Sequence, residues 1–150
     1  MSRKLNILLV EDNKLDAMFF TRALGKVAPD AKVFHAKDGM EALEMLRETD
    51  PASAVERPFV TLVDSNMPRM NGHEYLENLR ALDSDSDSVV FMFTTSDSPP
   101  DRSLDPANRV NGYFVKPQNS KGLKTILQTI RDFWSICETP EPAASSLQAS

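Results

Sequence analysis

The run Asn6-Ile7-Leu8-Leu9-Val10-Glu11-Asp12-Asn13 contains the pattern that decides the fold. Four consecutive apolar side chains are followed directly by acidic and amide side chains. A short, uninterrupted apolar run is typical of a strand that is buried on both faces of a parallel sheet. The polar residues then stand where the strand ends, which is where ligands bind in open α/β sheets.

Further apolar runs follow at intervals, and together with the first they predict five strands, at residues 6–10, 32–35, 59–63, 89–93 and 112–115. Parallel strands need crossover connections, which are right-handed and usually helical. The pattern therefore predicts an α/β fold in which helices cover both faces of a mostly parallel sheet.

Apolar periodicity predicts the helices and the residues that begin them. Asp12 or Asn13 can cap the first helix, Asp38 the second and Ser120 the last. The buried face of the first helix is expected to consist of residues that recur every fourth position, namely Leu15, Phe19, Ala23 and Val27, with Met18 beside them. The last helix carries a broad apolar stripe that includes Phe133 and Trp134. Because adjacent residues point about 100° apart on a helix, one of these two aromatic side chains can face a partner.

Two segments depart from regular structure. Residues 83–88 alternate aspartate and serine, but Ser88 and Thr94 stand where an EF-hand loop needs glycine and glutamate, so we expect a solvated turn. Pro99 and Pro100 suit the first turn of a fourth helix, whereas Pro106 in its interior costs about 3 kcal/mol. We therefore expect a short or broken fourth helix.

The composition excludes several classes of protein. The 150 residues carry 22 acidic and 17 basic side chains, a net charge of −5, which argues against nucleic-acid binding. No apolar run approaches the roughly 18 residues of a membrane span and the start lacks a secretory signal, so we expect a cytoplasmic protein with no membrane partner. A single cysteine, Cys137, and two distant histidines, His35 and His73, make thiolate or zinc sites poor hypotheses, so a bound metal must be held by oxygen. Both histidines are expected on the surface.

Polar side chains follow four of the predicted strands: Glu11 and Asp12, Asp64, Thr94 and Thr95, and Lys116. In a parallel sheet these residues meet at one edge. At 4 Å and an effective dielectric constant of about 20, each pair of carboxylates repels by about 4 kcal/mol, so either pKa values rise or a cation binds. A hard divalent cation such as Mg²⁺ or Mn²⁺ suits such a site, because it accepts carboxylate ligands and places its remaining coordination on water and phosphate oxygens.

These residues resemble the receiver domain of two-component response regulators. The matching motifs are Glu11-Asp12, Asp64 within VDSNMPRMNG (63–72), Thr94, and GYFVKP (112–117), and the resemblance covers about residues 5–137. It implies a flavodoxin-like (βα)5 fold with sheet order 2-1-3-4-5. The long loop before the third strand and the Phe133-Trp134 pair also resemble a subgroup of stand-alone receivers that includes partners of phytochrome-type kinases.

The resemblance implies that Asp64 is the phosphoacceptor, which attacks a phosphoryl group on a histidine of a sensor kinase or a phosphotransfer protein. Asp12 is implied to ligate Mg²⁺ or Mn²⁺ directly and Glu11 directly or through water. The backbone carbonyl of Asn66 is implied to complete the protein ligands, together with Asp64. The charge on the transferring group is then stabilised by the metal and by Lys116.

The resemblance also implies a switch. Thr94 hydrogen-bonds one phosphoryl oxygen, Lys116 pairs with another, and Tyr113 stands at the aromatic position that changes rotamer when the threonine moves. The Lys116–Pro117 bond is implied to be cis. The switched surface is the fourth-helix region with strand five and the last helix, through which the protein is expected to contact a downstream protein target or a second copy of itself.

Some positions depart from the common receiver pattern. Ser65 and Asn66 follow the acceptor, and Thr95 is larger than the usual residue. Asn66, Thr95 and Ser96 are therefore expected to tune dephosphorylation, because this region lines the path of the hydrolytic water. The receiver is expected to span residues 1–137, and residues 138–150, rich in Pro, Ala and Ser, are expected to be a disordered tail.

Three other functions fit part of the pattern. A phosphohydrolase with an aspartyl nucleophile needs a second aspartate where Asn66 stands, and Asn66 cannot supply a proton in that way. A flavodoxin-like cofactor binder needs a phosphate-cradling loop, and Glu11-Asp12 would repel a phosphate without a metal. A degenerate receiver that binds partners without phosphorylation stays open as an alternative.

Overall fold

The computed structural model describes residues 4–65, 67, 70–82, 85, 88–94 and 110–136. Its strands are β1 (Asn6–Val10), β2 (Lys32–Ala36), β3 (Val60–Asp64), β4 (Val89–Thr94) and β5 (Gly112–Val115). They pair in parallel in the order β2-β1-β3-β4-β5. The predicted strands and sheet order are confirmed, with boundaries that differ by a residue. β1 and β3 are buried along their whole length, as expected of near-continuous apolar strands inside a parallel sheet.

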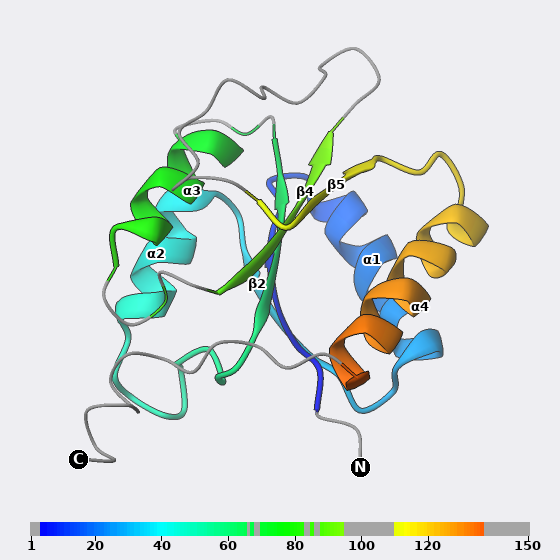
Figure 1. The fold of residues 1–150 in the computed structure, drawn as a ribbon, viewed down its shortest axis with the longest axis horizontal. Coiled ribbons are helices and arrows are strands. Elements are labelled where there is room, and N and C mark those ends of the chain that lie inside the picture. The colour runs from blue at the N-terminus through cyan, green and yellow to red at the C-terminus, as the bar shows by residue number, and fades with distance from the viewer. Residues whose placement is uncertain are drawn as a thin grey trace.

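Helices cover both faces of this sheet (Figure 1). α1 (Lys14–Val27) and α4 (Ser120–Ile136) lie side by side on one face, and α2 (Gly39–Arg47) and α3 (Gly72–Arg80) lie on the other. Each pair packs on its own apolar cluster, one around Phe20 and Trp134 and the other around Tyr75 and Met92. The predicted short or broken fourth helix and the predicted tail lie outside the described residues. None of the helices in the described part of the chain is long and apolar enough to cross a membrane.

The structure identifies the residues that cap the helices. Asn13 and Asp38 cap α1 and α2 as predicted, through bonds to backbone N–H groups of the first turn. Asn71 caps α3 in a capping box with Glu74. The expectation that Ser120 caps the last helix is wrong. α4 begins at Ser120, and the backbone N–H of Gly122 donates to Asn119 Oδ1 at 2.8 Å.

The predicted buried face of α1 is wrong in part. The buried residues are Ala17, Phe20, Ala23, Leu24 and Val27. Leu15, Met18 and Phe19 are instead 54%, 47% and 47% exposed. These three residues are spaced i, i+3 and i+4, so they adjoin one another on the helix surface. We refer to them as the α1 patch.

The aspartate–serine stretch is not simply a solvated turn. Asp85, in the middle of it, is 4% exposed and accepts two hydrogen bonds from the Arg57 guanidinium, at 2.8 Å from Nε and 2.7 Å from Nη2. Arg57 also donates to the carbonyls of Leu46 and Val55. This buried ion pair therefore ties the long loop before β3 to the segment before β4.

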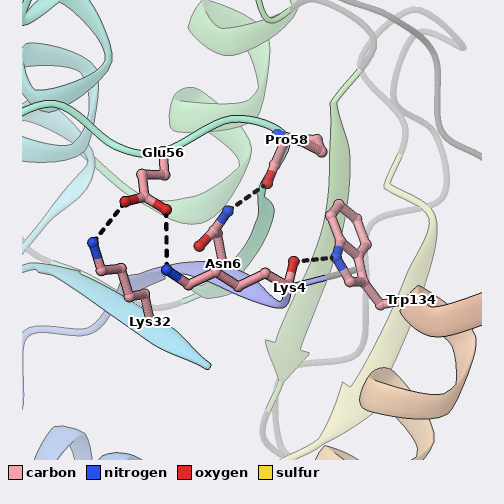
Figure 2. A network of polar contacts seen from close by, with 6 residues as sticks. All are labelled: Lys4, Asn6, Lys32, Glu56, Pro58 and Trp134. Carbon is pink, nitrogen blue, oxygen red and sulfur yellow. Dashed lines mark hydrogen bonds and ion pairs between the residues drawn. The ribbon is translucent and has the colours of Figure 1, made fainter. Parts of the chain in front are cut away.

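A second polar network fastens the N-terminal segment at the start of β1 (Figure 2). Glu56 bridges Lys32 and Lys4 at 2.6 and 3.4 Å, and Asn6 Nδ2 donates to the Pro58 carbonyl at 3.1 Å. Trp134 is 1% exposed, and its indole N–H donates to the Lys4 carbonyl at 2.9 Å. These contacts join the long loop, the first strand and the last helix at one place (Figure 2).

The two adjacent aromatic residues of α4 have different surroundings. Trp134 is buried in the α1–α4 cluster, whereas Phe133 is half-buried and lies edge-on against Phe91, with ring centroids 5.8 Å apart. Phe133 therefore packs against the sheet as well. The prediction that one of the pair contacts a partner stays a prediction.

Candidate functional site

Three carboxylates meet at the carboxyl end of the sheet, as the parallel topology predicts. Glu11 and Asp12 follow β1, and Asp64 ends β3, which is the neighbour of β1. One carboxylate oxygen from each residue lies within 4.8 Å of the others. Glu11 and Asp64 are buried and Asp12 is exposed, so the cluster is open to solvent on the Asp12 side.

Lys116 brings a positive charge to this cluster from the end of β5. Its Nζ lies 2.7 Å from Asp64 Oδ2, 3.5 Å from Glu11 Oε1 and 4.0 Å from Asp16 Oδ2. The backbone N–H of Lys116 donates to the Thr94 carbonyl at 2.8 Å, which fixes the point at which the lysine leaves the strand. The predicted convergence of Glu11, Asp12, Asp64 and Lys116 is therefore found in the structure.

The electrostatics of the cluster follow from burial and repulsion. Burial raises the pKa of the Glu11 carboxyl to about 8, the Asp64 carboxylate adds to the rise, and Lys116 opposes it. Burial alone would lower the pKa of Lys116, but its hydrogen bond to Asp64 and the nearby carboxylates outweigh this effect and raise the pKa. In the absence of another cation, the lysine carries the positive charge that the acidic cluster requires.

The donor set fits a hard divalent cation. It offers three carboxylate oxygens within 4.8 Å of one another and no nitrogen or sulfur ligand among the described residues of the cluster. Glu11 Oε2 is buried and accepts no hydrogen bond from the described part of the chain. A buried carboxylate oxygen without a donor is costly, and an added cation would satisfy it.

The two residues of the predicted switch lie near each other on the sheet. Thr94, at the end of β4, is buried. Tyr113 of β5 is half-buried and lies beside Met92, two positions before Thr94, so both side chains belong to the same face. Asn66, Thr95 and Ser96 lie outside the described residues, so the expectations for them stay predictions.

One expectation about the backbone is wrong. The cis peptide bond among the described residues is Arg57–Pro58, and Lys116–Pro117 is trans. Lys116 Nζ reaches Asp64 Oδ2 in this trans conformation. The contact between the two side chains therefore does not depend on a cis bond.

Two features near the cluster escaped the sequence reasoning. Asp16 lies in the first turn of α1, and its side chain lies 4.0 Å from Lys116 Nζ. His35, expected simply as a surface residue, is exposed but places its ring Nε2 2.8 Å from the Glu11 carbonyl oxygen. The position of Asp16, one helical turn after Asp12, could have indicated that Asp16 lies near the cluster. No feature of the sequence indicated the contact of His35.

A groove leads from the cluster along the surface between α1 and α4. It has a volume of about 640 Å³ and contains Asp64 and Lys116. Its walls combine apolar and basic side chains, including Phe19, Leu123, Arg22, Lys26 and Lys124. Phe19 of the α1 patch therefore lines the groove that leads to the acidic cluster.

Comparison with known protein families agrees with this geometry. Residues 7–128 match the response regulator receiver domain. The chain belongs to this family. Receivers are signalling switches that work by phosphorylation, and they interact with histidine kinases and downstream targets.

Two curated relatives illustrate the similarity of this receiver to others. It is 32% identical over 128 residues to the probable methanogenesis regulatory protein FilR2 of Methanothrix harundinacea, covering 85% of this chain and 82% of the relative. It is 30% identical over 128 residues to the response regulator Rcp1 of Synechocystis, covering 85% and 87% of the two chains.

Solved structures give the same result. The phosphorylated cyanobacterial phytochrome response regulator RcpA has a TM-score of 0.78 and 31% identity, covering 93% of this receiver and all of that chain (100%). The Mn²⁺-bound form of Rcp1 has a TM-score of 0.73 and 29% identity, covering 91% and 99%. These similarities confirm the predicted receiver fold and the resemblance to receivers of the phytochrome subgroup. The Mn²⁺ in the Rcp1 structure agrees with the acidic cluster of this receiver.

Proposed function

We propose that this receiver accepts a phosphoryl group on Asp64 from a histidine of a sensor kinase or a phosphotransfer protein, in a reaction that depends on Mg²⁺ or Mn²⁺. The observation that carries the proposal is the set of contacts around Asp64: two further carboxylates within 4.8 Å and the Lys116 ammonium at 2.7 Å. A carboxylate acts as a nucleophile toward phosphorus only when nearby positive charge offsets the charge of the phosphoryl oxygens.

Each residue has a distinct task in the proposed reaction. An Asp64 carboxylate oxygen forms a bond to phosphorus while the bond from phosphorus to the imidazole nitrogen of the donor breaks. Lys116 exchanges its contact with Asp64 for a phosphoryl oxygen, and Thr94 donates its hydroxyl to another. Glu11, Asp12, Asp64 and the Asn66 carbonyl would hold the metal ion, which would supply positive charge to the transferring group when bound.

The donor protein has to bring its histidine to the mouth of the groove. Phe19 of the α1 patch lines this groove, and exposed apolar side chains that adjoin one another can form a protein interaction site. The neighbouring Arg22 and Lys26 add positive charge on the same helix. We therefore propose that the donor docks on α1 through the α1 patch.

The proposed output is a protein–protein contact. Phosphorylation adds roughly −1.5 to −2 charges next to the existing carboxylates, and its oxygens attract Thr94 and Lys116. Movement of Thr94 would bias Tyr113 on the same face of the sheet, and with it the surface of the fourth-helix region, β5 and α4. A downstream protein or a second copy of the chain would bind there. Residues 1–137 would form this switch, with Asn66, Thr95 and Ser96 tuning its lifetime and residues 138–150 as a tail.

A degenerate receiver, which binds partners without phosphorylation, is the alternative, and one experiment separates the two. The protein is incubated with Mg²⁺ and acetyl phosphate, and its intact mass is measured. The proposal expects a single phosphoryl adduct that requires the metal and is lost in Asp64→Asn. No adduct in the wild-type protein would favour the degenerate receiver, and an adduct that survives Asp64→Asn would assign the acceptor to another residue.

A further inference from the structure

The ring of His35 holds the backbone at the point where β1 gives way to the acidic cluster. His35 lies on β2, which is an edge strand of the sheet, and in register it stands beside Leu9. Its side chain reaches past the end of β1, where Nε2 lies 2.8 Å from the Glu11 carbonyl oxygen. A carbonyl oxygen only accepts hydrogen bonds, so Nε2 is the protonated, donating nitrogen of the ring.

The chain has to turn at this point for the cluster to form. Successive side chains of an extended strand point to opposite faces of a sheet. Glu11 and Asp12 nevertheless both bring a carboxylate oxygen to within 4.8 Å of one from Asp64. The backbone achieves this by leaving the extended conformation after Glu11, with a bend at Asp12.

β2 supplies hydrogen bonds on both sides of this turning residue. The Glu11 N–H donates to the Ala36 carbonyl at 3.0 Å, which is the last ladder bond between the two strands. β2 ends at Ala36, so the Glu11 carbonyl takes its donor from a side chain, that of His35. The peptide that joins Glu11 to Asp12 is thereby held from one end by the histidine ring.

We propose that His35 is a positioning residue for the divalent-metal site, and this inference rests on the proposed function. By holding the Glu11 carbonyl, His35 fixes the orientation of the peptide from which the Asp12 carboxylate departs, and so keeps the carboxylates of Glu11 and Asp12 directed at Asp64. Partners that orient metal ligands typically change affinity by about 10–100-fold when they are removed. Because the His35 ring is exposed, its bond competes with water, and we expect the lower end, a loss of about tenfold.

The test compares three variants with the wild-type protein by isothermal titration calorimetry with MgCl₂, together with thermal unfolding in chelator. His35→Leu removes the donor, and His35→Gln places an amide donor on a side chain of similar reach. Thr21→Ala is the matched control, because Thr21 is exposed and lines the same shallow hollow beside α1 as His35 but bonds only within α1. The expected result is Mg²⁺ affinity about tenfold weaker in His35→Leu, mostly restored in His35→Gln and unchanged in Thr21→Ala.

The outcomes separate this inference from the proposed function. If the wild-type protein binds Mg²⁺ and His35→Leu binds Mg²⁺ with the same affinity, the positioning role is overturned and the proposed function stays intact. A loss of thermal stability in His35→Leu without a loss of affinity assigns a structural role alone and also overturns it. Wild-type protein that does not bind Mg²⁺ overturns both proposals.

Discussion

The replacement of Lys116 by methionine tests the electrostatic reasoning about the site. The substitution keeps most of the side-chain stem and removes the ammonium, whose Nζ lies 2.7 Å from Asp64 and 3.5 Å from Glu11. The buried Asp64 carboxylate, whose side chain is 7% exposed, then loses the ammonium bonded to it, and the Glu11 carboxyl, 10% exposed, loses a nearby positive charge. Loss of one partner of a buried ion pair costs about 3–5 kcal/mol. The Lys116 side chain is 31% exposed, so water screens part of the effect, and we expect a loss of about 2–3 kcal/mol in the free energy of unfolding.

The same substitution has the opposite effect on metal binding. In the wild-type protein the ammonium and the metal ion compete for the same carboxylate oxygens. Without the ammonium, the Asp12 and Asp64 carboxylates, which have oxygens within 4.8 Å of each other, repel by at least about 3.5 kcal/mol at an effective dielectric constant of about 20. A divalent ion relieves this repulsion. We expect Mg²⁺ to bind Lys116→Met about tenfold more tightly, which corresponds to about 1.4 kcal/mol.

Urea unfolding in chelator and in excess Mg²⁺ measures both effects. Lys116→Met should be less stable than the wild-type protein in chelator and should gain more stability from Mg²⁺. Lys26→Met, which removes the same charge from an exposed position at the end of α1, should change neither quantity by more than about 0.5 kcal/mol. The reasoning fails if Lys116→Met matches the wild-type stability in chelator or gains less from the metal.

Three further predictions concern the metal, the core and the docking surface. Mg²⁺ should raise the unfolding temperature of the wild-type protein and of the control Asp30→Ala, at an exposed position, but not that of Asp12→Ala. An equal rise in Asp12→Ala would remove Asp12 from the metal site. Arg57→Met should lower the free energy of unfolding by about 3 kcal/mol, because the 3% exposed Asp85 side chain loses the guanidinium that gives it two hydrogen bonds. Arg57→Met combined with Asp85→Leu should recover much of the loss in urea titrations. A loss below about 1 kcal/mol in the single variant would contradict the buried-charge reasoning. Phe19→Ser should slow phosphotransfer from a partner kinase and leave labelling by acetyl phosphate unchanged. Met40→Ser, at an exposed apolar position on α2, should affect neither reaction. If the kinase phosphorylates Phe19→Ser as fast as the wild-type protein, docking on the α1 patch is excluded.

The sheet and the convergence at its edge could be predicted because both depend on simple rules. Uninterrupted apolar runs predict buried parallel strands, and the carboxyl ends of parallel strands share an edge, so Asp12, Asp64 and Lys116 had to meet once the topology was known. Helix caps followed from residue type and position. Ser120 failed as a cap because the helix begins one residue earlier than a cap at that position requires, and Asn119 supplies the same chemistry.

The face of α1 could not be predicted from spacing alone. Residues four apart rotate by about 40° on a helix, so the stripe that starts at Leu15 drifts into the stripe that contains Phe20 and Leu24. Both stripes are apolar, and only the packing against the sheet and α4 decides which one is buried. In the sequence, an apolar helix face that binds a partner therefore has the same pattern as an apolar face that packs into the core.

Two polar contacts could not be predicted because their partners are far apart in sequence. Asp85 pairs with Arg57, 28 residues earlier, and His35 reaches a backbone carbonyl 24 residues away. The local composition of the aspartate–serine stretch predicts a solvated segment. It cannot indicate that an arginine from another loop pairs with one of the aspartates. Backbone acceptors such as the Glu11 carbonyl are invisible in a residue pattern altogether.

The separation of the core into two clusters gives the molecule two spectroscopically distinct halves. Trp134 is the only tryptophan in the chain, and it is buried between the sheet and the α1–α4 pair. Tyr75 is buried in the cluster on the opposite side of the sheet. Tryptophan emission therefore observes the layer that contains the α1 patch and the groove, whereas the packing of α2 and α3 is reported by tyrosine absorbance. Recording both signals in one unfolding experiment would reveal whether the two layers separate from the sheet together or one after the other.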